Sequence, residues 1–116
     1  MHEAMIICPL ADNEGKLRPG CFQGARDAML TAFGGCTVRN AEGYWRNADG
    51  KLFMENVKEL TVACDDSDTA RDYLETIADQ IGWKLKQHAV YIRYPSGEVA
   101  IRKTAHFWQE PVKSTA

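Results

Sequence analysis

A tyrosine and a glutamate eleven residues apart, Tyr44 and Glu55, are the side chains of this sequence best suited to bind a small molecule. Glu55 ends the apolar run Leu52-Phe53-Met54, where a purely structural strand needs no carboxylate. A partly buried carboxylate accepts hydrogen bonds from ammonium or hydroxyl groups, whereas an exposed carboxylate at a strand edge does little chemistry. Tyr44 precedes Trp45, and neighbouring strand residues point to opposite faces, so one of the two rings can line a pocket.

Two further pairs of residues are candidates to complete such a pocket. Gly34-Gly35 is most simply a helix stop, but residues without Cβ also let a ligand approach the main chain closely. Gln87-His88 directly precedes an expected strand and offers an amide and an imidazole. A histidine at a strand start is more often a surface residue.

Other kinds of catalytic site find little support. The sequence contains no phosphate-binding Walker loop, no G-x-S-x-G motif and no H-E-x-x-H motif. The cysteines form no C-x-x-C pair, and the three histidines share no metal-ligand spacing with them. We therefore expect neither a metal nor a disulfide framework. The cysteines are Cys8, Cys21, Cys36 and Cys64, and the histidines are His2, His88 and His106.

Composition limits the class of protein. A chain of 116 residues with 45% hydrophobic and 26% charged residues predicts one globular domain over residues 1–116. The net charge of −2 argues against nucleic-acid binding, which requires a basic surface. No apolar run reaches membrane-spanning length, and the N-terminus lacks the pattern of a signal peptide. We expect no membrane contact and a cytoplasmic location.

Hydrophobic periodicity and turn residues predict the elements. A helix is expected over 21–33, and a second begins within Asp65–Asp68 and ends near Gly82 or continues to Lys86. Leu10–Gly20 is expected to form a loop, and Pro9 is expected to end the first strand. Gly43 is expected to break the second strand, and the tail begins near Lys103. The expected strands are 5–8, 37–46, 51–64, 89–94 and 99–101.

The resulting order, β-α-β-β-α-β with a short extra strand, predicts an α+β fold. In this ferredoxin-like arrangement an antiparallel sheet carries both helices on one face. The other face needs a cover or a polar surface, and small proteins of this type commonly trimerise through it. We therefore expect an oligomer.

The chain resembles the phage-encoded S-adenosylmethionine lyases, long called S-adenosylmethionine hydrolases, over most of residues 5–101. The resemblance rests on the segments Phe33-Gly34-Gly35, Gly43-Tyr44-Trp45-Arg46 and Glu55, on the strand ending at Cys64 and the helix after it, and on the segment Gln87–Glu98. The spacing from Tyr44 to Glu55 is the most specific part. The resemblance implies a PII-like fold and a homotrimer with the substrate bound between subunits.

The resemblance also implies a reaction without cofactor or metal. The carboxylate of S-adenosylmethionine attacks its own γ-carbon and releases 5'-methylthioadenosine and L-homoserine lactone, which lowers the S-adenosylmethionine pool of a phage host. Glu55 and Tyr44 would be the catalytic residues: Glu55 would bind the substrate ammonium and Tyr44 the methionine part. Gln87 and His88, and the main chain at Gly34-Gly35, would add substrate contacts.

Two alternatives involve no catalysis. A PII-like trimer that binds an adenine nucleotide or another metabolite would keep the cleft and report its ligand to a partner. A phage-type inhibitor would bind a host protein, through the sheet or through Phe107 and Trp108. Formation of methylthioadenosine distinguishes the enzyme from both.

Overall fold

A computed structural model of the chain, in which residues 1–105 are described, contains five strands and two helices in the predicted order. The strands form one antiparallel sheet in the order β2-β3-β1-β4-β5. This confirms the predicted α+β fold. The elements are β1 (His2–Pro9), α1 (Pro19–Phe33), β2 (Thr37–Arg46), β3 (Leu52–Cys64), α2 (Asp68–Leu85), β4 (Ala89–Arg93) and β5 (Val99–Lys103).

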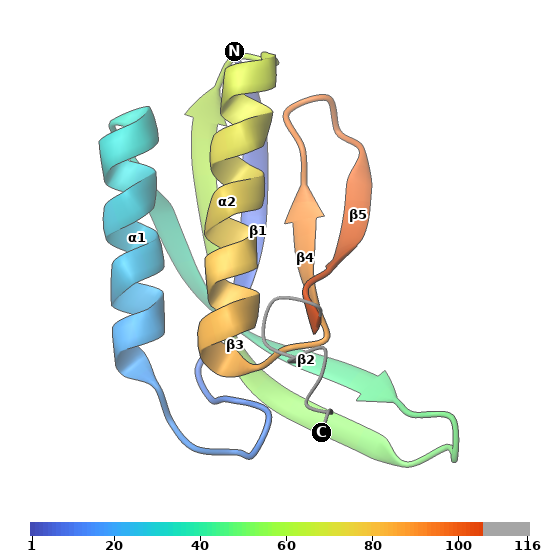
Figure 1. Ribbon diagram of the computed structural model, residues 1–116. Coiled ribbons are helices and arrows are strands. Elements are labelled where there is room, and N and C mark those ends of the chain that lie inside the picture. Colours follow the sequence, from blue (N-terminus) through green and yellow to red (C-terminus); the bar gives the residue numbers. More distant parts are fainter. Residues whose placement is uncertain (106–116) are drawn as a thin grey trace, which may run out of the picture.

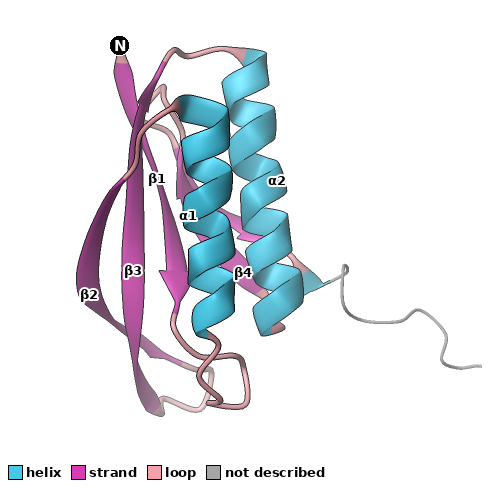
Figure 2. Cartoon of the chain, turned by 90° about the vertical axis from the view of Figure 1, so that its left-hand side faces the viewer, coloured by secondary structure: helices cyan, strands magenta, loops and turns pink. Residues whose placement is uncertain are grey.

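The hydrophobic core lies between the sheet and the two helices, which cover the same face of the sheet (Figures 1 and 2). Alternate residues of β1 and β3 point into this layer, because strand side chains alternate between faces. Apolar positions of α1 and α2 recur at helical spacing and meet them. Fully buried members include Ile6, Met29, Leu60, Leu74 and Ile81.

Several element ends follow from local chemistry that the sequence already displays. Ser67 caps α2 by accepting a hydrogen bond from the Ala70 amide at 3.1 Å. Gly34 ends α1 in the left-handed region with φ of 81°, as its position predicted. Helix α2 continues to Leu85, the longer of the two expected ends, and Lys86 closes it with φ of 53°.

Other expected boundaries were wrong. Pro9 does not stop β1 before itself: it pairs with Val57 as the last strand residue, a position where a missing amide costs little. Helix α1 begins at Pro19 and not at Cys21, because proline is favoured in the first helical turn. Gly43 does not break β2, which continues through it with Glu55 opposite.

The C-terminal part of the described chain is more ordered than expected. Lys103, taken from the sequence as the start of the tail, pairs with Ala89 in the sheet. The buried Thr104 donates its hydroxyl proton to the Gln87 carbonyl at 2.7 Å and packs against Gly82, where a Cβ would collide with it. Phe107 and Trp108, proposed above as docking residues, lie outside the described residues.

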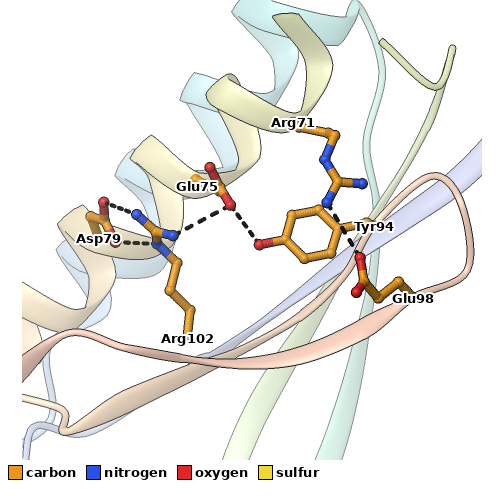
Figure 3. Close-up of polar contacts among 6 residues, drawn as sticks. All are labelled: Arg71, Glu75, Asp79, Tyr94, Glu98 and Arg102. Carbon is orange, nitrogen blue, oxygen red and sulfur yellow. Dashed lines mark hydrogen bonds and ion pairs between the residues drawn. The ribbon is translucent and has the colours of Figure 1, made fainter. Parts of the chain in front are cut away.

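A polar network fastens the β4–β5 hairpin to α2 (Figure 3). The Arg102 guanidinium of β5 contacts Asp79 at 2.7 Å and Glu75 at 3.3 Å. Tyr94 donates its hydroxyl proton to Glu75 at 2.7 Å, and burial together with that carboxylate raises the pKa of Tyr94 to about 12. Arg71 stacks on the Tyr94 ring at 4.2 Å. The network thereby fastens the hairpin to α2, and Gln87 and His88 lie directly before its first strand.

Replacing Arg102 by methionine should destabilise the fold by about 1–3 kcal/mol, since the partly buried Asp79 and Glu75 carboxylates would lose their shared cation. Urea denaturation measures this change. The control is Arg26→Met, which removes an exposed pair with Asp27 and should cost no more than about 1 kcal/mol. Equal stability of the two variants would contradict the structural role given to Arg102.

Candidate functional site

The pairing register of the β2–β3 hairpin determines which candidate residues can meet. Glu55 lies opposite Gly43, whereas Tyr44 lies opposite Met54. Because paired residues share a face and neighbours alternate, Glu55 and Tyr44 project from opposite faces of the hairpin. One copy of the chain therefore does not bring these two side chains together. As predicted, Tyr44 and Trp45 also point to opposite faces.

Glu55 lies on the sheet face that carries no helix and is about half buried. Within residues 1–105 its carboxylate has no hydrogen bond or ion pair with another side chain. Burial without a partner raises the pKa of Glu55 above its ordinary value. Gly43 opposite has no side chain to cover the carboxylate, so space remains beside it.

An aromatic pair adjoins Glu55 on the same face. Trp45 and Phe53 are opposite one another in the register, and their rings stack with centroids 4.5 Å apart and planes at 14°. Phe53 is two residues before Glu55, a separation of about 7 Å along the strand. Trp45 remains 50% exposed. An unpaired carboxylate beside an exposed aromatic surface suits a ligand with a cationic group and a planar ring.

Tyr44 is 61% exposed on the other face of the hairpin. Its hydroxyl donates a hydrogen bond to Glu42 at 2.9 Å, and this bond raises the pKa of Tyr44. The tyrosine is therefore accessible to a second molecule. In Figure 1 this part of the hairpin extends beyond the ends of both helices.

Gly34 and Gly35 lie far from Glu55 within one chain. They precede Thr37, which pairs with Thr61, six residues along β3 from Glu55. Six strand residues span roughly 20 Å. Gly34 serves as the helix stop, and a contact of these glycines with a ligand at Glu55 would again require another copy.

Gln87 and His88 lie at the same end of the sheet as Glu55, just before β4. Strand β1 separates β4 from β3, so two strand spacings, roughly 10 Å, lie between these positions. The Gln87 side chain donates to the Leu85 carbonyl at 3.4 Å, and the His88 carbonyl accepts from the Thr104 amide at 2.9 Å. Both residues therefore lie at the same end of the sheet as the candidate site at Glu55.

Residues 1–105 contain no metal-binding cluster and no disulfide. No group of three or more histidine, cysteine or acidic side chains is arranged there to hold a metal ion. The four cysteines, all within this range, are free thiols. None of the helices described is both long and apolar enough to cross a membrane.

The stacking of Phe53 on Trp45 is the part of the site that was not foreseen. A signal for it was present, because the Asn47–Gly50 turn lies symmetrically between the two rings. Asn47 pairs with Lys51 across this turn, and counting outward from that pair places Trp45 opposite Phe53. The same count places Tyr44 and Glu55 on opposite faces.

We predict that Glu55→Gln stabilises the fold at neutral pH. The pKa of Glu55 is raised in the folded state. At pH values above this folded pKa the ionised carboxylate therefore lowers the free energy of unfolding. This loss of stability disappears at pH values below the pKa of an unfolded glutamate, about 4.3. The melting temperature of the variant should therefore exceed that of the wild type at pH 7, and the two should converge as the pH falls towards 4. A lower melting temperature at pH 7 would contradict the environment assigned to Glu55.

Comparison with known proteins places this chain in a family and a fold. A family model described as Protein of unknown function (DUF3574) matches residues 25–101. No curated protein matches the chain. Among solved structures, a phage SAM lyase in complex with S-methyl-5'-thioadenosine superposes with a TM-score of 0.68 at 13% identity, covering 93% of this chain and 92% of the other. A phage SAM lyase in the apo state superposes with a TM-score of 0.65 at 14% identity, covering 93% of this chain and 91% of the other. The resemblance stated from the sequence is confirmed at the level of the fold.

Proposed function

The chain belongs to the DUF3574 family, and we propose that it is an S-adenosylmethionine lyase whose site forms between subunits around Glu55. One observation carries this proposal: an unpaired, half-buried carboxylate lies beside a stacked Trp45–Phe53 surface on a fold shared with phage SAM lyases. S-adenosylmethionine offers an ammonium, a sulfonium and an adenine ring, which match those groups in charge and shape.

In the proposed reaction the substrate supplies both reacting groups. The substrate carboxylate oxygen attacks the γ-carbon and forms a carbon–oxygen bond, while the carbon–sulfur bond breaks and its electron pair stays on sulfur. The products are neutral 5'-methylthioadenosine and L-homoserine lactone, which keeps the ammonium group. No proton transfer or added water is needed. S-methyl-5'-thioadenosine, named in the complex of one structure with the same fold, is the thioether that this step releases.

The role of the protein is then to bind and orient. Glu55 pairs with the substrate ammonium and holds the carboxylate in line with the breaking bond. Preorganisation of an intramolecular attack is worth up to about 7–11 kcal/mol in favourable cases. The opposite charges of carboxylate and sulfonium cancel in the transition state, so a pocket with little water favours it over the separated charges.

Two copies are required for Tyr44 to join Glu55 at one site, because one chain presents them on opposite faces. A two-fold dimer buries one surface against itself, whereas a closed ring lets one face of each hairpin meet the opposite face of the next. This arrangement favours the homotrimer that the resemblance implies.

The sheet face without helices supplies an apolar surface for such an assembly. Ile7 lies on it near the centre of the sheet, and Ile101 lies on it towards the edge and is 63% exposed, whereas Met5 and Val57 on this face are already buried within one chain. A subunit packed on this face would bury it and shield Glu55 from water. In a phage-infected cell the activity would act in the host cytoplasm and lower its S-adenosylmethionine pool.

Purified protein incubated with S-adenosylmethionine should release 5'-methylthioadenosine and homoserine lactone, detected by liquid chromatography and mass spectrometry. Glu55→Gln should lower kcat/KM by about 30-fold or more, near 2 kcal/mol, since it removes the charge that pairs with the substrate ammonium. The control, Glu14→Gln in an exposed loop, should keep wild-type turnover. No product over hours at micromolar protein would reject the activity and leave the metabolite-binding module as the alternative. Full turnover by Glu55→Gln would reject the residue assignment.

The pH dependence of kcat/KM should reflect the ionisation of Glu55. The carboxylate form binds the ammonium, and the pKa of the free protein's Glu55 is raised by burial. Activity should therefore decline on the acid side at a pH above about 4.3, the ordinary value for glutamate. A pH–rate profile of the wild type measures the decline, and the residual activity of Glu55→Gln should lack it. If kcat/KM of the variant declined at low pH as that of the wild type does, the titrating group would be another residue.

Co-expression of two impaired variants tests whether the site is shared between subunits. Tyr44→Ala and Glu55→Gln chains each lack one group, and a site built from neighbouring chains regains both in mixed trimers. With random assembly, about a quarter of the sites would be intact. Activity near that level, well above that of either variant alone, is expected. Mixed trimers without activity would show that each site takes both residues from one chain.

A further inference from the structure

An open cavity lies away from the hairpin, where the start of α1 meets the end of α2. It has a volume of about 440 Å³. These two helix ends lie side by side in Figures 1 and 2. Six residues line the cavity: Arg18, Gly20, Cys21, Trp83, Lys84 and Lys86.

The lining of this cavity is cationic, although the whole chain carries a net charge of −2. None of the lining residues is acidic. Arg18 is paired with Asp12 at 3.0 Å, so its charge is largely compensated. Among residues 1–105, Lys84 and Lys86 have no ion-pair partner. Two uncompensated positive charges therefore border the same cavity.

The placement of Lys84 is supported by its neighbours. A Cβ on Gly24 of α1 would lie 3.6 Å from the Lys84 Nζ, so the ammonium reaches across from α2 to α1. The Cys21 thiol has a lowered pKa, chiefly through its hydrogen bond with Cys8 and also through the positive charge of Lys84. The amino-terminal end of α1, which carries a partial positive charge, lies at the same place.

We infer that this cavity is a binding site for a small anion of the diphosphate class, either free or as an ester with a planar ring. Two unpaired lysines match a ligand with two or more negative charges. The volume suits a small organic ligand, and the exposed Trp83 indole offers a surface on which a ring can stack.

The site is separate in chemistry from the one proposed at Glu55. S-adenosylmethionine carries a net positive charge, which two unpaired lysines repel. The cavity residues come from α1, α2 and the loop before α1, and the hairpin contributes none of them. The inference therefore does not rest on the proposed lyase activity.

A structural role for the lysines is the main alternative. Lys84 lies in the last turn of α2, where a cation stabilises the helix through its dipole. That role requires no ligand. It predicts a loss of thermal stability on neutralisation without any effect on anion binding.

Isothermal titration calorimetry of the full chain with inorganic pyrophosphate, at about 0.15 M salt, tests the inference. We expect one site per chain. Lys84→Gln combined with Lys86→Asn should weaken binding by about tenfold or more, because it removes both unpaired charges. Asparagine tolerates the left-handed backbone at position 86, which keeps the variant folded. The control, Arg39→Gln on β2, removes one exposed charge on the sheet face that carries no helix, away from the cavity, and should bind as the wild type does.

A second titration with uridine diphosphate separates the two sources of the diphosphate group. If uridine diphosphate binds more tightly than pyrophosphate and Trp83→Leu removes the difference in affinity, the ligand is an ester whose ring stacks on Trp83. If both probes bind with equal affinity, the ligand is the free anion. The inference is overturned if neither probe binds the wild type, or if the control weakens binding as much as the double variant. Turnover of S-adenosylmethionine by the double variant should equal that of the wild type, so failure of one proposal leaves the other standing.

Discussion

The alternation of side chains along one hairpin is the constraint on which the proposed site depends. Pairing of Gly43 with Glu55 places the carboxylate on the open face of the sheet, and the same pairing places Tyr44 on the other. A shift by one residue would reverse both. The register is fixed by the Asn47–Gly50 turn and by the core position of Leu60 further along β3. Local turn chemistry and core packing thus determine which residues a single chain can combine.

The contribution of Glu55 to the stability of the fold agrees with a role in binding a cation. Glu55 is half buried, lacks a counter-ion among residues 1–105 and has a raised pKa, so it costs stability in the isolated chain. A cationic ligand would compensate that cost. The Arg102 network shows the opposite case: its carboxylates are paired with cations and a phenol, and it fastens α2 to the β4–β5 hairpin. Glu55 at one candidate site and Lys84 and Lys86 at the other are therefore unpaired charges of opposite sign.

Much of the fold could be predicted from the sequence. Helical periodicity, turn residues and the Gly34 stop located the elements in order, because each is a local rule. The errors at Pro9, Gly43 and Lys103 have a common cause. Pairing with a neighbouring strand decides whether such residues continue a strand, and partners distant in sequence are not visible locally.

The residue types of the candidate site were visible in the sequence, but their arrangement in space was not. Glu55 stood out because a carboxylate ended an apolar run, and its half-buried environment agrees with that interpretation. The separation of Gly34-Gly35 from Glu55 follows from the register, which only the sheet reveals. Whether another subunit brings Tyr44, Gly34 and Gly35 to Glu55 depends on an interface that a single chain does not contain.

The position of one oxygen atom tests the central claim most directly. Protein and S-adenosylmethionine are incubated in heavy-oxygen water, and the homoserine finally recovered is fragmented in a mass spectrometer. Lactone formation takes the side-chain oxygen from the substrate's own carboxylate, so the account predicts label in the carboxyl group alone, introduced when the lactone opens. Label in the side-chain hydroxyl would show that water attacked the γ-carbon and would contradict an intramolecular reaction.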